Sequence, residues 1–387
     1  MTSPMMVVGI DATNLRGGGG LTHIVEMLRA AEPPAAGVRQ VVVWGGTQTL
    51  DSLDARPWLL KASASSLDAG LLRRAAWQRF ALAASARRAG CEVLFVPGGT
   101  HVGDFHPVVT MSQNLLPFEL GELARFGLSA RAARLGALRV TQSRSFRAAD
   151  GVVFLTRYAR DRVVSVIGPL RGVSTIIPHG THIRFRLPPR PQRSIESCSD
   201  PEPFRLLYVS IVNVYKHQWH VVEAAARLRR DGLPVALDLA GPAYAPSLLR
   251  LERALDRFDP RREWARYHGA VPYGELHALY ATADVGIFAS SCENMPNILL
   301  ESMAAGLPIA CARRGPMPEV LGDAGVYFDP EQPGDITRAL GELIVSPELR
   351  EEKAAASFAA AREFTWEKCA ADTFSFLVRV ARGRHGA

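Results

Sequence analysis

Two glutamates near the C-terminal end, Glu293 and Glu301, are the strongest chemical signal in this sequence of 387 residues. The apolar run 284–289 precedes them and is bounded like a buried strand of a parallel sheet. Pro296 suits the first turn of a helix, and Gly306 suits its end. One carboxylate is therefore expected on a strand-to-helix loop and the other along the helix, beside free N–H groups that favour an anionic ligand.

This arrangement resembles the Glu-(x)7-Glu motif of retaining glycosyltransferases with the two-domain GT-B fold, specifically glycosyltransferase family 4 (GT4). The Ser-x-x-Glu lead-in and the Glu-Ser-Met-Ala-Ala-Gly-Leu-Pro exit fit that motif as well. Most members have Gly-Phe after the first glutamate, whereas Asn294 and Met295 stand here. The resemblance covers nearly the whole chain and is strongest from Leu206 to Pro330. It looks most like bacterial mannosyl- and glycosyltransferases that build surface polysaccharides.

The resemblance implies a donor site in the second half of the chain. Glu301 would hold the donor ribose, and Glu293 would grip the transferred sugar. Glu293 and Lys216 would be the catalytic residues. The segment that follows Glu293 would assist, namely Asn294, Met295, Pro296 and Asn297, through the main-chain N–H groups of its three non-proline residues. Lys216 would face the donor diphosphate, but the arginine that relatives carry five residues earlier falls on Ile211. Either Lys216 acts alone with backbone donors, or an arginine from elsewhere supplies the second charge.

A run of four glycines, 17–20, follows the first expected strand. Such a loop lets the backbone approach a ligand closely, and the resemblance implies that Gly18 and Gly19 face the donor diphosphate and the acceptor. Gln113 stands where many relatives have a histidine that touches the sugar. Gln113 and Asn114 can each hydrogen-bond a hydroxyl, but neither can do acid–base work near neutral pH.

Two further positions, Gly241 and Val271, match family positions that surround the donor ribose and base. No Asp-x-Asp occurs in the sequence, so we expect no metal bound through carboxylates. The nucleotide-sugar donor is then a co-substrate, and no cofactor is expected.

Composition indicates a soluble globular protein, with 48% hydrophobic and 21% charged residues, in a chain long enough for two domains. The start of the sequence lacks a basic region followed by an apolar core, and no apolar run is long enough to span a membrane. The five cysteines are scattered and form no Cys-x-x-Cys. These features favour a cytoplasmic protein.

The formal net charge of +7 comes mostly from arginine, concentrated in the stretches 71–88 and 125–147. There arginines alternate with apolar residues at a spacing that suits a helix. Such helices can lie on an anionic bilayer, on the inner face of the cell membrane, or can simply expose a solvated face. We find no signature of nucleic-acid binding.

Apolar runs alternate with helical segments in two successive sets, which predicts an α/β protein with two Rossmann-like parallel-sheet domains. Helices are expected near 20–31, 67–89, 117–147 and 157–166. The first domain is predicted over 1–187, followed by a proline-rich linker over 188–203 and a donor-binding domain over 204–365. The family implies a C-terminal helix, about 366–382, that crosses back to the first domain, and a ligand cleft between the domains.

We therefore expect a metal-independent retaining hexosyltransferase. It would move a sugar from GDP-mannose, or otherwise a UDP-sugar, to a hydroxyl of a glycan or lipid-linked acceptor in polysaccharide or glycolipid biosynthesis. A nucleotide-sugar epimerase or hydrolase on the same fold is one alternative. A non-catalytic membrane-surface binding protein is another. An NAD-dependent enzyme is disfavoured because the dinucleotide fingerprint is missing.

Overall fold

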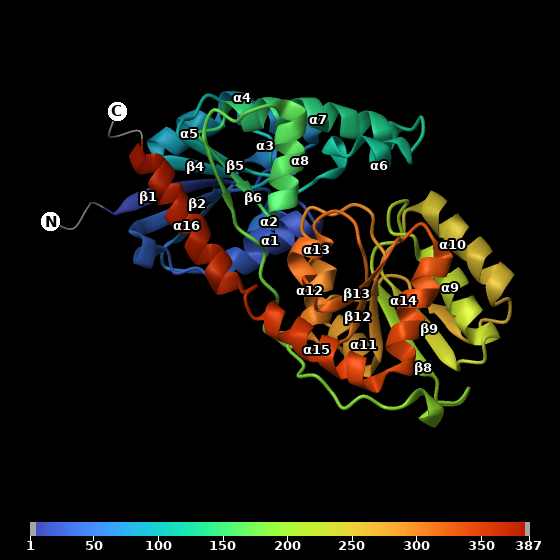
Figure 1. Ribbon diagram of the computed structural model, residues 1–387. Helices are drawn as coiled ribbons and strands as arrows, with labels where there is room; N and C mark the ends of the chain where they lie inside the picture. The colour runs from blue at the N-terminus through green and yellow to red at the C-terminus, as the bar shows by residue number, and fades with distance from the viewer. Residues whose placement is uncertain (1–4, 384–387) are drawn as a thin grey trace. The chain divides into compact units, whose positions relative to one another are not determined.

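The computed structural model describes residues 5–383, which divide into two compact α/β units (Figure 1). The first unit contains the chain up to Phe118, the segment Leu128–Gly180 and the chain from Thr365 onwards. The second unit contains Glu119–Gly127 and Thr181–Phe364. Each unit has a parallel sheet with helices packed on it, so the predicted fold class is confirmed. The predicted cleft depends on how the units are placed and stays a prediction.

The first unit contains a seven-stranded parallel sheet, counted over the described residues, in the order β3-β2-β1-β4-β5-β6-β7. Its strands are β1 (Met6–Asp11), β2 (Val38–Trp44), β3 (Leu59–Ala62), β4 (Val93–Val96), β5 (Val108–Met111), β6 (Gly151–Phe154) and β7 (Val173–Ile176). The strand order reverses between β1 and β4, and the carboxyl ends of such a pair form a topological switch point where ligands bind in open α/β sheets.

The helices of this unit cover a core of aliphatic and phenylalanine side chains, which include Phe118, Phe146 and Phe154. They are α1 (Gly18–Arg29), η1 (Pro33–Ala36), α2 (Thr47–Asp51), α3 (Ser65–Asp68), α4 (Leu71–Phe80), α5 (Leu82–Arg88), η2 (Leu116–Phe118), α7 (Ala130–Ala148), α8 (Arg157–Ile167) and α16 (Trp366–Gly383).

The second unit contains a six-stranded parallel sheet within the same described range, in the order β10-β9-β8-β11-β12-β13. Its strands are β8 (Phe204–Val209), β9 (Val235–Ala240), β10 (Ala265–Tyr267), β11 (Val285–Phe288), β12 (Ile309–Ala312) and β13 (Gly325–Phe328). Its helices are α6 (Leu120–Ala124), η3 (Ile183–Phe185), η4 (Ile195–Ser197), α9 (Gln218–Arg230), α10 (Ala245–Phe258), α11 (Leu276–Thr282), α12 (Asn297–Ala304), α13 (Met317–Leu321), α14 (Pro333–Val345) and α15 (Pro347–Ala361). Here the switch point lies between β8 and β11.

Two sequence predictions of secondary structure were incomplete or wrong. The sequence did not predict the edge strands β3 and β13, since both are four residues long and only partly buried and so lack the fully buried run of the inner strands. The helix predicted over 117–147 is broken at Gly127, whose φ of 57° is left-handed and ends the helical turn. Ser129 then starts α7 by accepting a hydrogen bond from the Ala132 N–H (3.2 Å).

The C-terminal helix α16 belongs to the first unit, as the resemblance implied. Its first residue, Trp366, lies against two histidine rings, with centroids 5.8 Å from His23 and 5.6 Å from His179. The two histidine rings stack at 4.6 Å, and burial, followed by the proximity of His179, holds the pKa of His23 well below its usual range. A Cβ on Gly180 would lie 2.2 Å from the Trp366 nitrogen, so only glycine permits this close approach.

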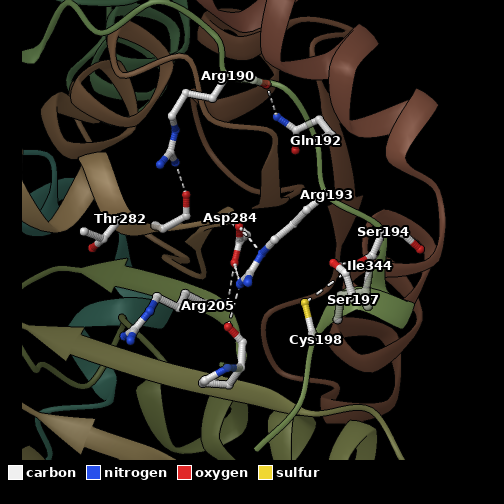
Figure 2. Close-up of polar contacts among 12 residues, drawn as sticks. Arg190, Gln192, Arg193, Ser194, Ser197, Cys198, Arg205, Thr282, Asp284 and Ile344 are labelled. Atoms are coloured by element: carbon white, nitrogen blue, oxygen red, sulfur yellow. Dashed lines mark hydrogen bonds and ion pairs between the residues drawn. The ribbon is translucent and has the colours of Figure 1, made fainter. Parts of the chain in front are cut away.

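The proline-rich segment predicted as a linker lies within the second unit (Figure 2). Arg193 donates to the Asp284 carboxylate (2.6 Å), and the same carboxylate accepts from the Arg205 N–H (2.7 Å). The Arg190 guanidinium donates to the carbonyls of Ala281 and Ala283. The sequence indicated a tether because prolines and serines are frequent there, but arginine side chains bind this segment to the end of α11 and the start of β11.

Candidate functional site

The switch point of the second unit brings together Lys216, in the loop after β8, and Glu293, in the loop after β11. The two strands are adjacent in the sheet, so their carboxyl-end loops are neighbours although the two residues lie 77 positions apart. The Lys216 ammonium forms an ion pair with the Glu293 carboxylate. Only 7% of the lysine side chain and 15% of the glutamate side chain are exposed. The two residues predicted as catalytic therefore form one buried pair.

Aromatic rings and main-chain hydrogen bonds hold Lys216 in place. Its ammonium lies 5.3 Å from the ring centroids of both Tyr215 and Phe288, a distance at which aromatic rings attract a cation. The Tyr208 hydroxyl donates to the Lys216 carbonyl (2.9 Å), and the Ser291 N–H donates to the Tyr215 carbonyl (2.8 Å). The second of these bonds joins the loop after β8 to the loop after β11.

The helix that follows Glu293 begins one residue later than predicted. Pro296 is the N-cap residue of α12, and the first helical residue is Asn297. The Asn297 N–H donates to the Met295 carbonyl (3.0 Å), so this predicted ligand donor is already engaged in a tight turn. Asn294 and Met295 are buried beside Glu293. Pro296 has no N–H, so Asn294 and Met295 carry the remaining N–H groups of the segment.

Glu301 lies on α12 in a nearly closed environment with only 5% of the residue exposed. The Tyr280 hydroxyl donates to its carboxylate (3.2 Å). Burial raises the pKa of Glu301 to about 7, although hydrogen bonds from Tyr280 and Tyr273 and the charge of Arg184 oppose the rise. The Arg184 guanidinium in turn lies 5.4 Å from the Tyr273 ring centroid. Glu301 is thus poised to change protonation state near neutral pH.

Gly241 and Val271, the other predicted donor positions, lie on loops of the same unit. Gly241 has a φ of 142°, and a Cβ there would lie 2.2 Å from the Ser210 carbonyl. Glycine therefore lets the loop after β9 touch the loop after β8. The Tyr267 hydroxyl donates to the Gly241 carbonyl (2.8 Å). Val271 is half-buried in the loop before α11.

The segment 119–127, predicted as part of a basic helix, instead packs beside this site within the second unit. The Arg125 guanidinium pairs with Glu122 (2.8 Å) and with Glu331 (2.7 Å), and Glu122 is hydrogen-bonded to Ser291. Burial lowers the pKa of His217 to about 3, with His220 and then Arg125 adding to the effect. An arginine from elsewhere in the chain therefore does lie near the loop that carries Lys216, which keeps open the second explanation for Ile211.

Cys292 lies beside Glu293 but is not a nucleophile. Burial, and next the charge of Glu293, raise the pKa of the Cys292 thiol well above its ordinary value. The thiol therefore stays protonated at neutral pH, and a protonated thiol is a poor nucleophile. The residue is buried and fills space beside the site.

The first unit brings its predicted residues together at the carboxyl ends of β1 and β5, the two strands that flank β4. Gly18 starts α1 with a φ of 66°, and the space around Gly18 and Gly19 is open where a Cβ would stand. A Cβ on Gly20 would lie 2.8 Å from the Gln113 amide oxygen, so the glycine loop and Gln113 are in direct contact. The Asn114 side-chain oxygen accepts from the Leu116 N–H (3.2 Å) and is thereby used in the local turn.

Sequence reasoning missed Asp11 at the end of β1. Its carboxylate accepts hydrogen bonds from the Thr13 hydroxyl (2.6 Å), the Thr13 N–H (3.1 Å) and the Gln78 amide (2.6 Å). Burial raises its pKa despite these bonds. Gln78 also accepts from the Asn14 amide (3.1 Å). Asp11 thus fixes the loop that leads into the glycines, and its signal in the sequence was an acidic residue directly after an apolar strand.

His101, after β4, was also missed. Burial lowers the pKa of His101 to about 4, so the ring is neutral at physiological pH.

Within residues 5–383, no group of three or more His, Cys, Asp or Glu side chains could hold a metal ion. In that same range no helix has the length and apolar character needed to cross a membrane.

The second unit is similar to known glycosyltransferases. Residues 191–358 match the family model described as "Glycosyl transferases group 1". The chain is 35% identical over 115 residues to O-antigen chain mannosyltransferase B of Escherichia coli, which covers 30% of each chain. It is 29% identical over 247 residues to the GDP-mannose-dependent alpha-(1-6)-phosphatidylinositol monomannoside mannosyltransferase of Mycolicibacterium smegmatis, covering 60% of this chain and 61% of that protein. The chain thus spans less than two thirds of the length of these curated relatives.

Solved structures share the fold over nearly the whole chain. Sucrose-phosphate synthase from Thermosynechococcus elongatus superposes with a TM-score of 0.76 at 16% identity, covering 98% of this chain and 100% of that one. WaaG, a glycosyltransferase involved in lipopolysaccharide biosynthesis, superposes with a TM-score of 0.67 at 14% identity, covering 96% and 99%. These similarities confirm the two-domain α/β architecture that the sequence predicted.

Proposed function

We propose that this chain, a member of the group 1 glycosyl transferases through residues 191–358, transfers a sugar from a nucleoside-diphosphate sugar to a hydroxyl group. The observation that carries the proposal is the Lys216–Glu293 pair at the β8/β11 switch point, next to the start of α12. A phosphate-binding cation, a sugar-binding carboxylate and main-chain N–H groups then lie at the edge of the sheet where ligands of such folds bind.

The chemistry follows from where charge develops. Breaking the bond between the sugar and the diphosphate puts negative charge on the departing phosphate oxygen. A pre-positioned ammonium in a dry site, together with main-chain N–H groups, stabilises that charge strongly. Lys216 fills this role in the proposal without a metal ion. Activity that persists unchanged in a chelator such as EDTA would support it, and complete loss of activity that Mg²⁺ restores would contradict it.

The two glutamates divide the recognition of the donor in this proposal. Glu301 accepts hydrogen bonds from the ribose hydroxyls, and its tyrosine partners hold the carboxylate in one orientation. Glu293 accepts from hydroxyls of the transferred sugar. Replacing either by glutamine keeps the shape but removes the charge, and it should weaken donor turnover more than it changes thermal stability.

Retention at the anomeric carbon is the stereochemical proposal. Gln113 and Asn114 follow β5, beside the first unit's switch point, and cannot act as bases, so the leaving phosphate oxygen would take the acceptor proton on the same face of the sugar. The anomeric configuration of the product, measured by NMR with an α-linked donor, tests this step. An inverted product would exclude it.

GDP-mannose is the proposed donor, because two relatives are named as mannosyltransferases and one of them as GDP-mannose-dependent. The first experiment is calorimetric titration of the purified protein with GDP, UDP and NAD in separate runs without metal. Micromolar binding of GDP alone, about −8 kcal/mol, would support both the site and the donor. Binding of UDP alone would keep the site and change the donor. Binding of NAD alone would exclude the transferase proposal.

The proposed acceptor is a glycan or lipid-linked glycan at the inner, cytoplasmic face of a bacterial cell membrane. Exposed apolar side chains accompany the arginines of α4, namely Leu71, Leu72 and Phe80. On α7, Arg139, Arg144 and Arg147 line a cavity of about 230 Å³. Arginines beside exposed apolar groups suit an anionic bilayer.

Sedimentation with vesicles tests the membrane proposal. Vesicles containing phosphatidylglycerol should pull down the protein, and vesicles of phosphatidylcholine alone should not. The variant L72S/F80S should lose most of this binding. The control is Leu249→Ser, which changes an exposed leucine on α10 in the other unit and should leave binding intact. Equal loss in both variants would contradict the assignment of this face.

A further inference from the structure

The proposed phosphate-binding cation, Lys216, and the proposed sugar-binding carboxylate, Glu293, form an ion pair with each other. Lys216 and Glu293 are both largely buried, and the aromatic faces of Tyr215 and Phe288 flank the ammonium. In such a low-dielectric site a charge interacts strongly with its nearest partner, and a charge without a partner is costly. A phosphate oxygen that approaches Lys216 therefore competes with Glu293 for the same ammonium.

Removing Glu293 from Lys216 leaves the carboxylate among groups that cannot neutralise it. Burial, followed by the charge of Glu293, raises the pKa values of Tyr208, Cys292 and Cys311, so these neighbours stay uncharged. Two more carboxylates, Glu119 and Glu122, act on Cys292 with the same sign as Glu293. Once Lys216 has turned to a phosphate, these neighbours offer the carboxylate no opposite charge, and the guanidinium of Arg125 is already paired with Glu122 and Glu331.

An intact sugar donor and a bare nucleoside diphosphate differ in how they meet this cost. The donor carries sugar hydroxyls, which can donate hydrogen bonds to the released carboxylate. At the place of the sugar, the nucleoside diphosphate carries only further phosphate oxygens, which give the carboxylate no hydroxyl donors. With the donor, both Lys216 and Glu293 therefore gain a new partner, whereas with the diphosphate only Lys216 does.

We propose that Glu293 acts as a built-in competitor for Lys216, so that the site prefers the sugar-bearing donor over the nucleoside diphosphate left after transfer. The inference rests on the proposed function and adds to it a reason for product release. Once the sugar has left, its hydroxyls no longer hold the carboxylate. Glu293 returns to Lys216 and displaces the diphosphate. No covalent bond changes in this exchange.

The test compares four ligands by calorimetry, in the pairs GDP with GDP-mannose and UDP with UDP-glucose. Glutamine at position 293 keeps the shape but is a weak competitor for an ammonium. Whichever of the two ligand pairs the protein binds, the affinity of Glu293→Gln for its diphosphate should rise roughly tenfold, because the carboxylate that competes for Lys216 is gone. The affinity for the sugar donor should stay level or fall. The preference for donor over diphosphate should therefore collapse.

Two further variants separate competition from other effects. Glu331→Gln also removes one negative charge from the second unit, but Glu331 pairs with Arg125 and not with Lys216. It should leave the preference for donor over diphosphate unchanged. Glu293→Asp keeps the charge on a shorter side chain that reaches Lys216 less well, so the preference should fall part of the way. Thermal unfolding curves must show that every variant compared is folded, and the aspartate variant serves as the test should the glutamine variant not fold.

The outcomes distinguish this inference from the proposed function. If the unaltered protein binds none of the four ligands, the proposed function itself is wrong. If it binds a pair and Glu293→Gln weakens diphosphate and donor to the same extent, Glu293 only maintains the site and the inference is overturned. A preference that changes as much in Glu331→Gln as in Glu293→Gln would also overturn it, because general electrostatics would then explain the effect.

Discussion

The two switch points of this protein have the same topology and opposite chemistry. At its β1/β4 switch point the first unit presents open glycines, and the neutral amide of Gln113 reaches them from the end of the next strand, β5. Its carboxylate, Asp11, is held in the loop by three hydrogen bonds. Between β8 and β11 the second unit presents the ion pair of Lys216 and Glu293. A parallel sheet of this order therefore provides the position of a site, and the side chains on its loops decide whether that site handles charge or only shape and hydrogen bonds.

Lys216→Ala should break the contrast most strongly. It removes the ammonium of the second switch point, so the affinity for the bound nucleoside diphosphate should fall about 100-fold or more. Calorimetry measures this loss. Gln113→Ala, at the first switch point, is the comparison and should change diphosphate affinity less than about threefold. Similar losses in the two variants would show that charge handling is shared between the units.

Gly20→Ala should damage the neutral switch point alone. The added Cβ would lie 2.8 Å from the Gln113 amide oxygen and must displace that side chain. We expect sugar transfer to fall roughly tenfold while diphosphate affinity stays the same, because the second unit is untouched. Gly136→Ala, on α7 where a Cβ meets nothing within 4 Å, is the matched control. A loss of diphosphate affinity in Gly20→Ala would contradict the assignment.

A smaller effect should come from the protonation of Glu301. Because burial raises the pKa of this carboxyl to about 7, about a tenth of it is ionised at pH 6 and about nine tenths at pH 8. The ionised form accepts hydrogen bonds from the ribose, so nucleotide affinity should rise roughly fivefold over this range. Calorimetry at several pH values measures the rise.

Two variants sharpen the assignment of this pH dependence. Glu301→Gln has no ionisable group at the position, and its affinity should not follow pH through this window. Tyr280→Phe removes a hydrogen bond that lowers the pKa of Glu301, so the midpoint should move to higher pH. A midpoint that stays in place in Glu301→Gln would assign the titration to another group.

The smallest expected effect concerns stability in the first unit. Burial holds the pKa of His23 well below 6.5, so as pH falls below 6.5 the unfolded chain takes up a proton that the folded protein excludes. His23 therefore destabilises the fold increasingly with acid. His23→Phe should remove roughly 1–2 kcal/mol of the loss in unfolding free energy between pH 6.5 and pH 5, measured by urea titration. An unchanged acid dependence would contradict this account.

Local patterns predicted the parts of the site that depend on neighbouring residues. A buried strand, a loop and an apolar helix follow one another around Glu293 and Glu301, so their relative placement needs only strand and helix geometry. The boundary of α12 was misplaced by one residue, since the main-chain hydrogen bond from Asn297 to Met295 is invisible to side-chain pattern. The segment 119–127 was assigned to the wrong unit, because residue spacing shows that a helix can form but not what it packs against.

The sequence by itself determined the α/β class, the strands with continuous apolar runs and the identity of the residues that carry charge. These depend on side-chain type and on periods of a few residues, which any stretch of chain displays locally. Only the tertiary structure decided that Lys216 meets Glu293 and that Gly20 touches Gln113. Both contacts join segments far apart in the chain. The first exists because β8 and β11 are neighbours in their sheet, and the second joins the segments that follow β1 and β5, which flank β4.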